Sequence, residues 1–188
     1  LPMALDVVQK DQVDRVTAEA AEKLGGLHIL VNSGSYPGGS AGATGPIETI
    51  IDDELIANFD VKYVGALRCA RAAIPFMKEQ GWGRIINITG TSEPEAVNIA
   101  SSAKAAVHAW AKGLSRVLAA DGITVNCLPP GRIKSEQILN KVHPDPAERQ
   151  AFVEANIPVG YLGEPEDMAG VAIYLSSRAG AYLTGGII

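Results

Sequence analysis

The stretch Gly81-Trp-Gly-Arg-Ile-Ile-Asn-Ile-Thr89 decides the fold of this chain of 188 residues. Three isoleucines in a short run predict a strand over Arg84–Thr89. An earlier run, His28–Asn32, is dense in Ile, Leu and Val and predicts a strand that is covered on both faces. Thr124–Leu128 predicts a further strand, and the apolar run Leu1–Asp6 stands in the place of the first one.

Helical patterns separate these runs. They predict long helices over Asp11–Leu24 (with Asp11 as its N-cap), Asp53–Gln80 and Ala100–Ala120. Towards the end of the chain, weaker patterns predict three shorter helices and the start of one more strand, over Ser135–Val142, Pro146–Asn156, Glu164–Ser176 and Gly186–Ile188.

Alternating strands and helices at this spacing predict an α/β fold. We expect a Rossmann-like, doubly wound parallel sheet flanked by helices, in a single domain over residues 1–188. Ligands bind such sheets at the carboxyl ends of the strands. The segments after Asn32, Thr89 and Leu128 are therefore the candidate sites, and all three are rich in Gly, Pro, Ser or Thr.

Composition excludes several classes of function. Apolar residues make up 47% of the chain and the formal net charge is −5 without a Lys/Arg cluster, which argues against disorder and against a nucleic-acid partner. The apolar stretches are too short for a membrane span, and Leu1–Lys10 lacks the features of a signal peptide. We expect a cytoplasmic protein with a small-molecule substrate.

Cysteine and histidine give no sign of a metal site. Cys69 and Cys127 lie in segments that we expect to be buried, and neither a CxxC nor an HExxH pattern occurs. The sequence predicts two reduced core thiols and no bound metal.

Six stretches resemble the short-chain dehydrogenase/reductase superfamily, and in particular members similar to 3-oxoacyl-carrier-protein reductases. They occur in the family's order and spacing along nearly the whole chain. They are Asp6-Val7, Ile29–Gly34, Gly81–Thr89, Ser102–Ala106, Gly122–Asn126 with Pro130-Gly131, and Gly163–Ala169.

The resemblance implies an NAD- or NADP-dependent oxidoreductase that moves a hydride between the nicotinamide and a carbonyl or alcohol carbon. Lys104 matches the lysine that holds the nicotinamide ribose hydroxyls. The other positions implied in cofactor binding are Asp6 and Val7 at the adenine, Asn32 and Gly34 beside the ribose, and Pro130, Gly131, Ile133 and Ser135 at the nicotinamide.

The chain departs from the family's pattern around its catalytic residues. Ala100 stands where the family has a tyrosine proton donor, and a general acid contributes about 10²–10⁴ in rate. The family's serine falls near Gly90, so we expect Thr89, Thr91 or Ser92 to take its place, and Ser101 to supply a hydroxyl near Lys104. Lys62 stands where the family often has an asparagine, and we interpret it as a lysine with a buried stem and an exposed head.

A second departure concerns the ends of the chain. Leu1 falls where the family's third strand begins, so the family's opening strand and glycine-rich turn, which bind the pyrophosphate, precede the first residue. The far end stops before the family's last strand is complete. We therefore expect this sequence to be part of a longer protein.

Three functions stay open from the sequence. The first is a reductase with an altered proton relay around Lys104. The second is an inactive nucleotide-binding or oligomeric scaffold, and the third is another reaction in the same cleft. The spacing Ser101-Ser-Ala-Lys104 also matches the SxxK pattern of penicillin-recognising acylases, which the order of elements does not favour.

The long helices also predict assembly. Apolar stripes over Leu55–Met77 and Ala105–Leu118 exceed what one sheet face needs, and small residues would allow close approach to a second subunit. We expect a homodimer or homotetramer. The small residues are Gly65, Ala66, Ala70, Ala105, Ala106 and Ala109.

Overall fold

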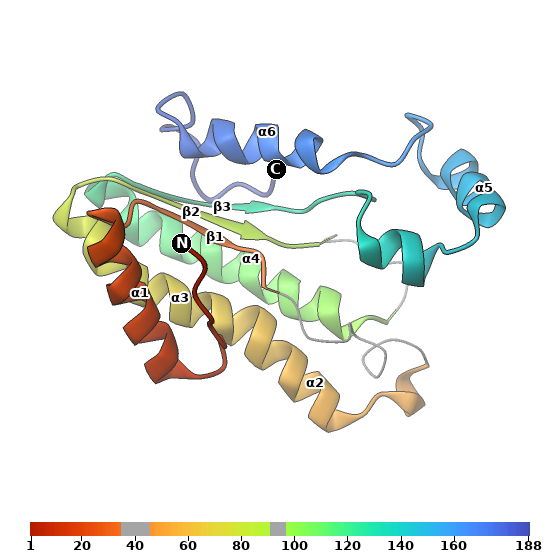
Figure 1. Ribbon diagram of the computed structural model, residues 1–188, viewed down its shortest axis with the longest axis horizontal. Coiled ribbons are helices and arrows are strands. Elements are labelled where there is room, and N and C mark those ends of the chain that lie inside the picture. The colour runs from red at the N-terminus through yellow and green to blue at the C-terminus, as the bar shows by residue number, and fades with distance from the viewer. Residues whose placement is uncertain (35–45, 91–96) are drawn as a thin grey trace.

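A computed structural model describes residues 1–34, 46–90 and 97–188. Helices and strands alternate along it (Figure 1). The elements are α1 (Lys10–Leu24), β1 (Ile29–Asn32), the 3₁₀ turn η2 (Ile47–Thr49), α2 (Asp52–Phe59), the π-helix η3 (Asp60–Val64), α3 (Gly65–Glu79), β2 (Gly83–Ile88), α4 (Ile99–Leu118), the 3₁₀ turn η4 (Ala119–Asp121), β3 (Ile123–Leu128), the π-helix η5 (Ile138–Val142), α5 (Pro146–Asn156) and α6 (Pro165–Ser176).

The three strands form a parallel sheet in the order β1-β2-β3. In the register of this sheet Ile85 lies between Leu30 and Val125. A parallel bridge between Cys127 and Ile187 continues the pairing beyond β3. The predicted parallel α/β sheet is therefore confirmed, and the last residues do begin a further pairing.

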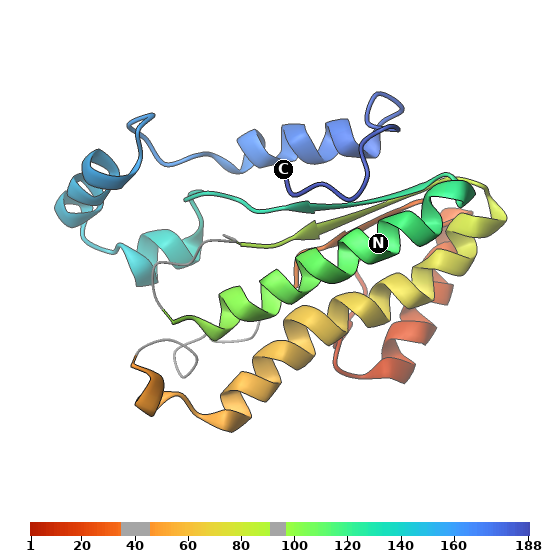
Figure 2. The ribbon, with the colours of Figure 1, turned by 180° about the vertical axis from the view of Figure 1, so that it is seen from behind.

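Helices cover both faces of the sheet (Figure 1, Figure 2). On one face, Ile85 and Val125 pack with apolar side chains of α3 and α4, such as Met77 and Ala111. On the other face, Ile86, Leu128 and Leu175 of α6 form a second cluster. The helices α5 and η5 lie beyond the carboxyl ends of β2 and β3, at the end where the site is expected (Figure 1).

Two glycines are required by the local geometry at the starts of β2 and β3. A Cβ on Gly83 would lie 2.8 Å from the Cβ of Met77, so only glycine lets α3 pack this closely on the start of β2. Gly122, with φ +73°, turns the chain into β3 in a left-handed conformation that other residues rarely adopt.

Three local predictions are wrong. Residues 1–6 form no strand, because β1 is the first element that pairs in the sheet. Asp11 lies in the first turn of α1, whose N-cap is Gln9. Strand β1 is not covered on both faces: Ile29 and Val31 are 43% and 47% exposed, because α6 packs over β2 and β3 and leaves this face of β1 open.

The long helix predicted over Asp53–Gln80 is continuous but not uniform. It runs as α2, then one π-helical turn at η3, then α3. Such π-turns are rare and often occur at functional sites, because the extra residue alters the direction of neighbouring side chains. Periodicity alone predicts the helix but not this turn.

The small residues predicted to face a second subunit differ in exposure, and Ala106 is half-buried. Gly65, Ala66 and Ala70 are buried within the chain, so they serve its internal packing. Ala105 and Ala109, on the outer side of α4, are exposed. The intramolecular core thus takes up much of the stripe on α3.

Candidate active site

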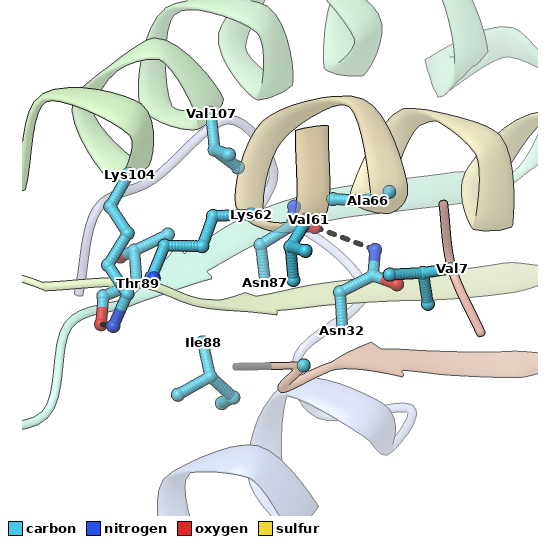
Figure 3. A pocket seen from close by; sticks show the side chains of 12 residues that line it. Val7, Asn32, Val61, Lys62, Ala66, Asn87, Ile88, Thr89, Lys104 and Val107 are labelled. Carbon is cyan, nitrogen blue, oxygen red and sulfur yellow. Dashed lines mark hydrogen bonds between the residues drawn. The ribbon is translucent and has the colours of Figure 1, made fainter. Parts of the chain in front are cut away.

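A pocket opens at the carboxyl end of β2 (Figure 3). Strands β1 and β2, the π-turn η3 with the start of α3, helix α4 and the segment before α1 all contribute side chains to it. The free space within it is about 30 Å³, enough for about two water molecules. Its lining residues are Val7, Asn32, Gly34, Val61, Lys62, Gly65, Ala66, Asn87, Ile88, Thr89, Lys104 and Val107.

Lys104 reaches the pocket from the second turn of α4. The helix starts at an N-cap, Asn98, whose side chain accepts a hydrogen bond from the backbone N–H of Ser101. The Lys104 Nζ donates a hydrogen bond of 2.9 Å to the backbone carbonyl of Thr89. Burial lowers the pKa of Lys104 below its ordinary value, because the charged amine loses hydration. The ammonium group is thereby held where β2 ends.

Thr89 joins Lys104 to a buried histidine. Its hydroxyl lies 2.8 Å from the Nε2 of His108, which is one helical turn beyond Lys104 in α4. Thr89 is 1% exposed and His108 is 8% exposed. Burial also lowers the pKa of His108, which favours the neutral imidazole. Lys104 and His108 thus bind different atoms of Thr89, the first its backbone carbonyl and the second its hydroxyl.

Lys62 brings a second amine to the same pocket. It lies in the π-turn η3, and its Nζ donates a hydrogen bond to the Oδ1 of the buried Asn58. Burial, together with the charge of Lys104, lowers the pKa of Lys62 to about 8. Figure 3 shows the side chains of Lys62 and Lys104 converging on Thr89.

Asparagines line the pocket along the sheet. The Nδ2 of Asn32 donates to the Oδ1 of Asn87 at 2.9 Å, so adjacent strands present amide groups at the same level. On the far side of Asn87 lies the buried thiol of Cys127, whose pKa burial raises to about 11, although a hydrogen bond with Asn87 acts in the opposite direction. Cys127 and Cys69 are both free and buried, as predicted.

The structure brings together four of the residues predicted to bind the cofactor. Val7, Asn32, Gly34 and Lys104 all line the pocket. A Cβ added to Gly34 would meet no atom within 4 Å, so a ligand has room to approach its backbone.

The remaining predicted residues that the structure describes do not line this pocket. Asp6 is exposed, and its carboxylate accepts from the backbone N–H of Val8. Ser101 lies in the first turns of α4 without lining the pocket. Thr91 and Ser92 lie outside the described residues. Pro130, Gly131, Ile133 and Ser135 form the segment that follows β3, where Ile133 forms a parallel bridge to Gly163 and the Ser135 hydroxyl accepts from the N–H of Ile138.

Sequence reasoning misses two residues of the site. His108 is placed there by the i, i+4 spacing from Lys104, a signal visible in the sequence. The expectation that Lys62 has an exposed head is wrong. The residue is 9% exposed, and the π-turn directs its amine into the pocket. No periodicity argument identifies that turn.

The donor set suits the sugar of a nucleotide. Ribose hydroxyls accept hydrogen bonds from ammonium and amide groups, and Lys104, Asn32 and Asn87 supply both at one strand edge. Apolar side chains such as Val7 and Val107 flank these polar groups, as is usual in cofactor sites.

Comparison with known proteins identifies the family of this chain. The family model described as Enoyl-(Acyl carrier protein) reductase matches residues 1–188. The chain is 30% identical to a 2-dehydro-3-deoxy-L-rhamnonate dehydrogenase (NAD(+)) of Sphingomonas sp. over 97% of its own length and 71% of that protein's. The chain belongs to the short-chain dehydrogenase/reductase superfamily. It is also 29% identical to a 3-oxoacyl-[acyl-carrier-protein] reductase of Thermotoga maritima, over all of its length and 74% of that protein's.

Solved structures of the superfamily share the fold. The NADPH-dependent reductase YwfH of bacilysin biosynthesis superposes with a TM-score of 0.87 at 30% identity, over 99% of this chain and 74% of that one. A 7α-hydroxysteroid dehydrogenase in complex with NADH superposes with a TM-score of 0.85 at 25% identity, over 97% of this chain and 69% of that one. Among the described residues, no helix combines the length and the apolar character that crossing a membrane requires.

Proposed function

We propose that this superfamily member is an NAD- or NADP-dependent oxidoreductase that acts on a small carbonyl or alcohol substrate through an altered active site around Lys104. The single observation that carries the proposal is the position of the Lys104 ammonium at the carboxyl end of β2, in one pocket with Asn32 and Asn87. The NADPH dependence of YwfH and the NADH bound to the steroid dehydrogenase favour this cofactor class.

Four pocket residues would hold the cofactor. Lys104 would bind the hydroxyls of the nicotinamide ribose, and Asn32 and Gly34 would lie beside a ribose. Val7 would offer an apolar surface to the adenine. The bound nucleotide would supply the hydride donor or acceptor. Asp6 and the segment of Pro130, Gly131, Ile133 and Ser135 would reach the cofactor from outside the pocket.

Side chains and backbone groups of the chain itself would position the charge and transfer the proton. The Thr89 carbonyl fixes the Lys104 Nζ, and the lowered pKa of this amine brings it closer to neutral pH than an exposed lysine. The Thr89 hydroxyl binds the imidazole of His108, through a different atom from the carbonyl that holds Lys104. We place the proton relay around the Lys104 amine, with Thr91, Ser92 or Ser101 as the hydroxyls that meet the substrate.

The test combines cofactor binding with turnover. Wild-type protein is titrated with NADH and NADPH and then assayed by nicotinamide absorbance against a panel of ketones and aldehydes. Lys104→Met should abolish turnover and weaken binding of the preferred cofactor by about tenfold or more, because a charged hydrogen bond is worth about 1.5–3 kcal/mol. The exposed Lys23, in an ion pair with Glu19, gives the control Lys23→Met, which should behave as wild type. Unchanged binding and turnover in Lys104→Met would refute the proposal.

One observation favours a second function. Ala100 lies one turn before Lys104 in α4 and carries no hydroxyl, so the group that most often donates the proton in this superfamily is replaced by a methyl. A nucleotide-binding scaffold without catalysis would have the same feature. Tight binding of NADH or NADPH without turnover on any substrate of the panel would decide for the scaffold.

We also propose that the protein forms a homodimer or homotetramer through the exposed side of α4. Ala105 and Ala109 would allow close approach there, and Val117 on the same helix is 69% exposed. Light scattering after size exclusion tests this: Ala109→Arg should yield monomers. A monomeric wild-type protein would contradict the proposal.

A further inference from the structure

Two lysine amines share one small pocket. Lys62 extends from the π-turn and Lys104 from α4, and Figure 3 shows their side chains converging on Thr89. The Lys62 Nζ donates to Asn58, whose own Nδ2 donates at 2.8 Å to the backbone carbonyl of Glu54. The amide of Asn58 is therefore fixed, and it fixes the position of the Lys62 amine.

The surroundings of the Lys62 amine disfavour its charged form. Its apolar neighbours in the pocket lining include Val61, Ala66 and Val107. Lys104 on α4 lines the same pocket, and its charge acts on the Lys62 amine. Among the described residues that line the pocket none is Asp or Glu.

Other charged groups on the neighbouring elements are engaged or remote. Asp60, on the same π-turn as Lys62, is bound to Arg68 at 2.7 Å. The acidic residues of α2, Asp52, Asp53 and Glu54, lie in its first turn, and the first two are exposed. The pocket thus brings two amines together, and its described lining residues include no carboxylate.

We propose that Lys62 is a carbonyl-reactive amine that binds small oxo acids covalently as an imine. The neutral amine attacks the carbonyl carbon to form a C–N bond, and the resulting carbinolamine loses its oxygen as water. Both hydrogens of the amine leave in that water, so the step needs no oxidant or reductant. The ammonium of Lys104 binds the carboxylate of the oxo acid, which places the carbonyl carbon at Lys62.

The lowered pKa of Lys62 supports the reactivity proposed for its amine. Burial first, and the charge of Lys104 second, lower the pKa of Lys62 from 10.5 to about 8. At pH 7 about one Lys62 amine in ten is then neutral, which is about 300 times the neutral fraction of an ordinary lysine. A desolvated lysine beside a second cation is a known arrangement for an amine that attacks carbonyls.

Glyoxylate is the probe of choice for this pair of amines. It is the smallest oxo acid, and its aldehyde carbon, for Lys62, is bonded directly to the carboxylate that Lys104 would bind. Acetaldehyde, of similar size but without a carboxylate, tests the part assigned to Lys104.

The experiment traps the imine and locates it. The protein is incubated at pH 7 with glyoxylate and cyanoborohydride, without any nicotinamide nucleotide, and modified peptides are identified by mass spectrometry. One carboxymethyl group on Lys62 is expected, formed at least tenfold faster than on exposed lysines such as Lys10 and Lys23. Modification of Lys10 and Lys23 at the same rate as Lys62, or no modification of Lys62, would overturn the proposal. This mapping uses wild-type protein alone, so it does not depend on the folding of a variant.

Two variants refine the result. Lys62→Arg, which keeps the charge, should remove the fast modification, and Lys23→Arg should leave it unchanged. In wild-type protein glyoxylate should react at Lys62 faster than acetaldehyde, by at least tenfold, and Lys104→Met should abolish this preference. A preference that persists in Lys104→Met would refute the carboxylate site. Because no cofactor is present, this inference and the proposed oxidoreductase function stand or fall separately.

Discussion

Replacement of Lys62 by methionine gives the sharpest prediction about stability. The change removes a buried amine and keeps a long, flexible apolar side chain in its place. Lys62 is 9% exposed, and its pKa is about 8 in the folded protein against 10.5 ordinarily. At pH 7 the folded state therefore holds a charge in an unfavourable environment, and the variant does not.

The magnitude follows from that difference. Each pKa unit corresponds to about 1.4 kcal/mol, so the fall from 10.5 to about 8 gives an upper bound of about 3.5 kcal/mol, and access of water to the amine reduces it to about 1–3 kcal/mol. Against this gain, the variant leaves the Oδ1 of the buried Asn58 without the Lys62 donor, at a cost of about 1–3 kcal/mol at every pH. The two effects nearly cancel at pH 7.

The pH dependence separates the two effects. Between about pH 8 and pH 10.5 the unfolded chain holds the Lys62 proton and the folded chain does not. The free energy of unfolding of the wild type therefore rises with pH relative to the variant. Urea unfolding at a series of pH values should show the wild type gaining about 1–3 kcal/mol over Lys62→Met across this interval. The exposed Lys23→Met should follow the wild type in parallel. Parallel curves for Lys62→Met as well would refute the burial of this amine.

Three further predictions concern the turn before β3, the buried hydrogen bond and the thiol. Gly122→Ala should destabilise the protein by about 2 kcal/mol or more in urea unfolding, because φ is +73° and the new Cβ would crowd a neighbouring backbone carbonyl. Gly113→Ala, inside α4 with open space beside it, should stabilise it by about 1 kcal/mol, and the opposite order would contradict the turn geometry. Thr89→Val should lower the free energy of unfolding by about 1–3 kcal/mol, because the Nε2 of His108 loses the hydroxyl as its partner. An unchanged unfolding midpoint would show that this hydrogen bond does not stabilise the protein. Cys127, with its pKa raised to about 11, should resist iodoacetamide at pH 8 until the protein unfolds, and fast alkylation of the native protein would argue against its burial.

The sequence predicts the sheet well because its signal is local. Arg84–Thr89 and Thr124–Leu128 match β2 and β3 to within a residue at each end, since buried parallel strands require continuous apolar runs. Whether β1 is covered depends on how other elements pack against it, and the residues of the strand alone do not predict that. Val31 has the composition of a core residue, yet it is 47% exposed, because no described helix packs over it.

The site is only partly predictable for the same reason. Lys104 and Asn32 follow from motif positions at strand ends and a helix start, and both line the pocket. Lys62 escapes prediction because its direction depends on the π-turn, where one extra residue in the helix alters the periodicity. His108 falls on the same helical face as Lys104, but its burial and its bond to Thr89 depend on how α4 packs against the end of β2.

A crystal structure of the protein with NADH or NADPH tests the central claim most directly. The account predicts that the nicotinamide ribose lies at the carboxyl end of β2, with its hydroxyls within hydrogen-bond distance of the Lys104 Nζ and with Asn32 beside the cofactor. A nucleotide bound elsewhere on the protein, or a Lys104 amine turned away from the ribose, would contradict it.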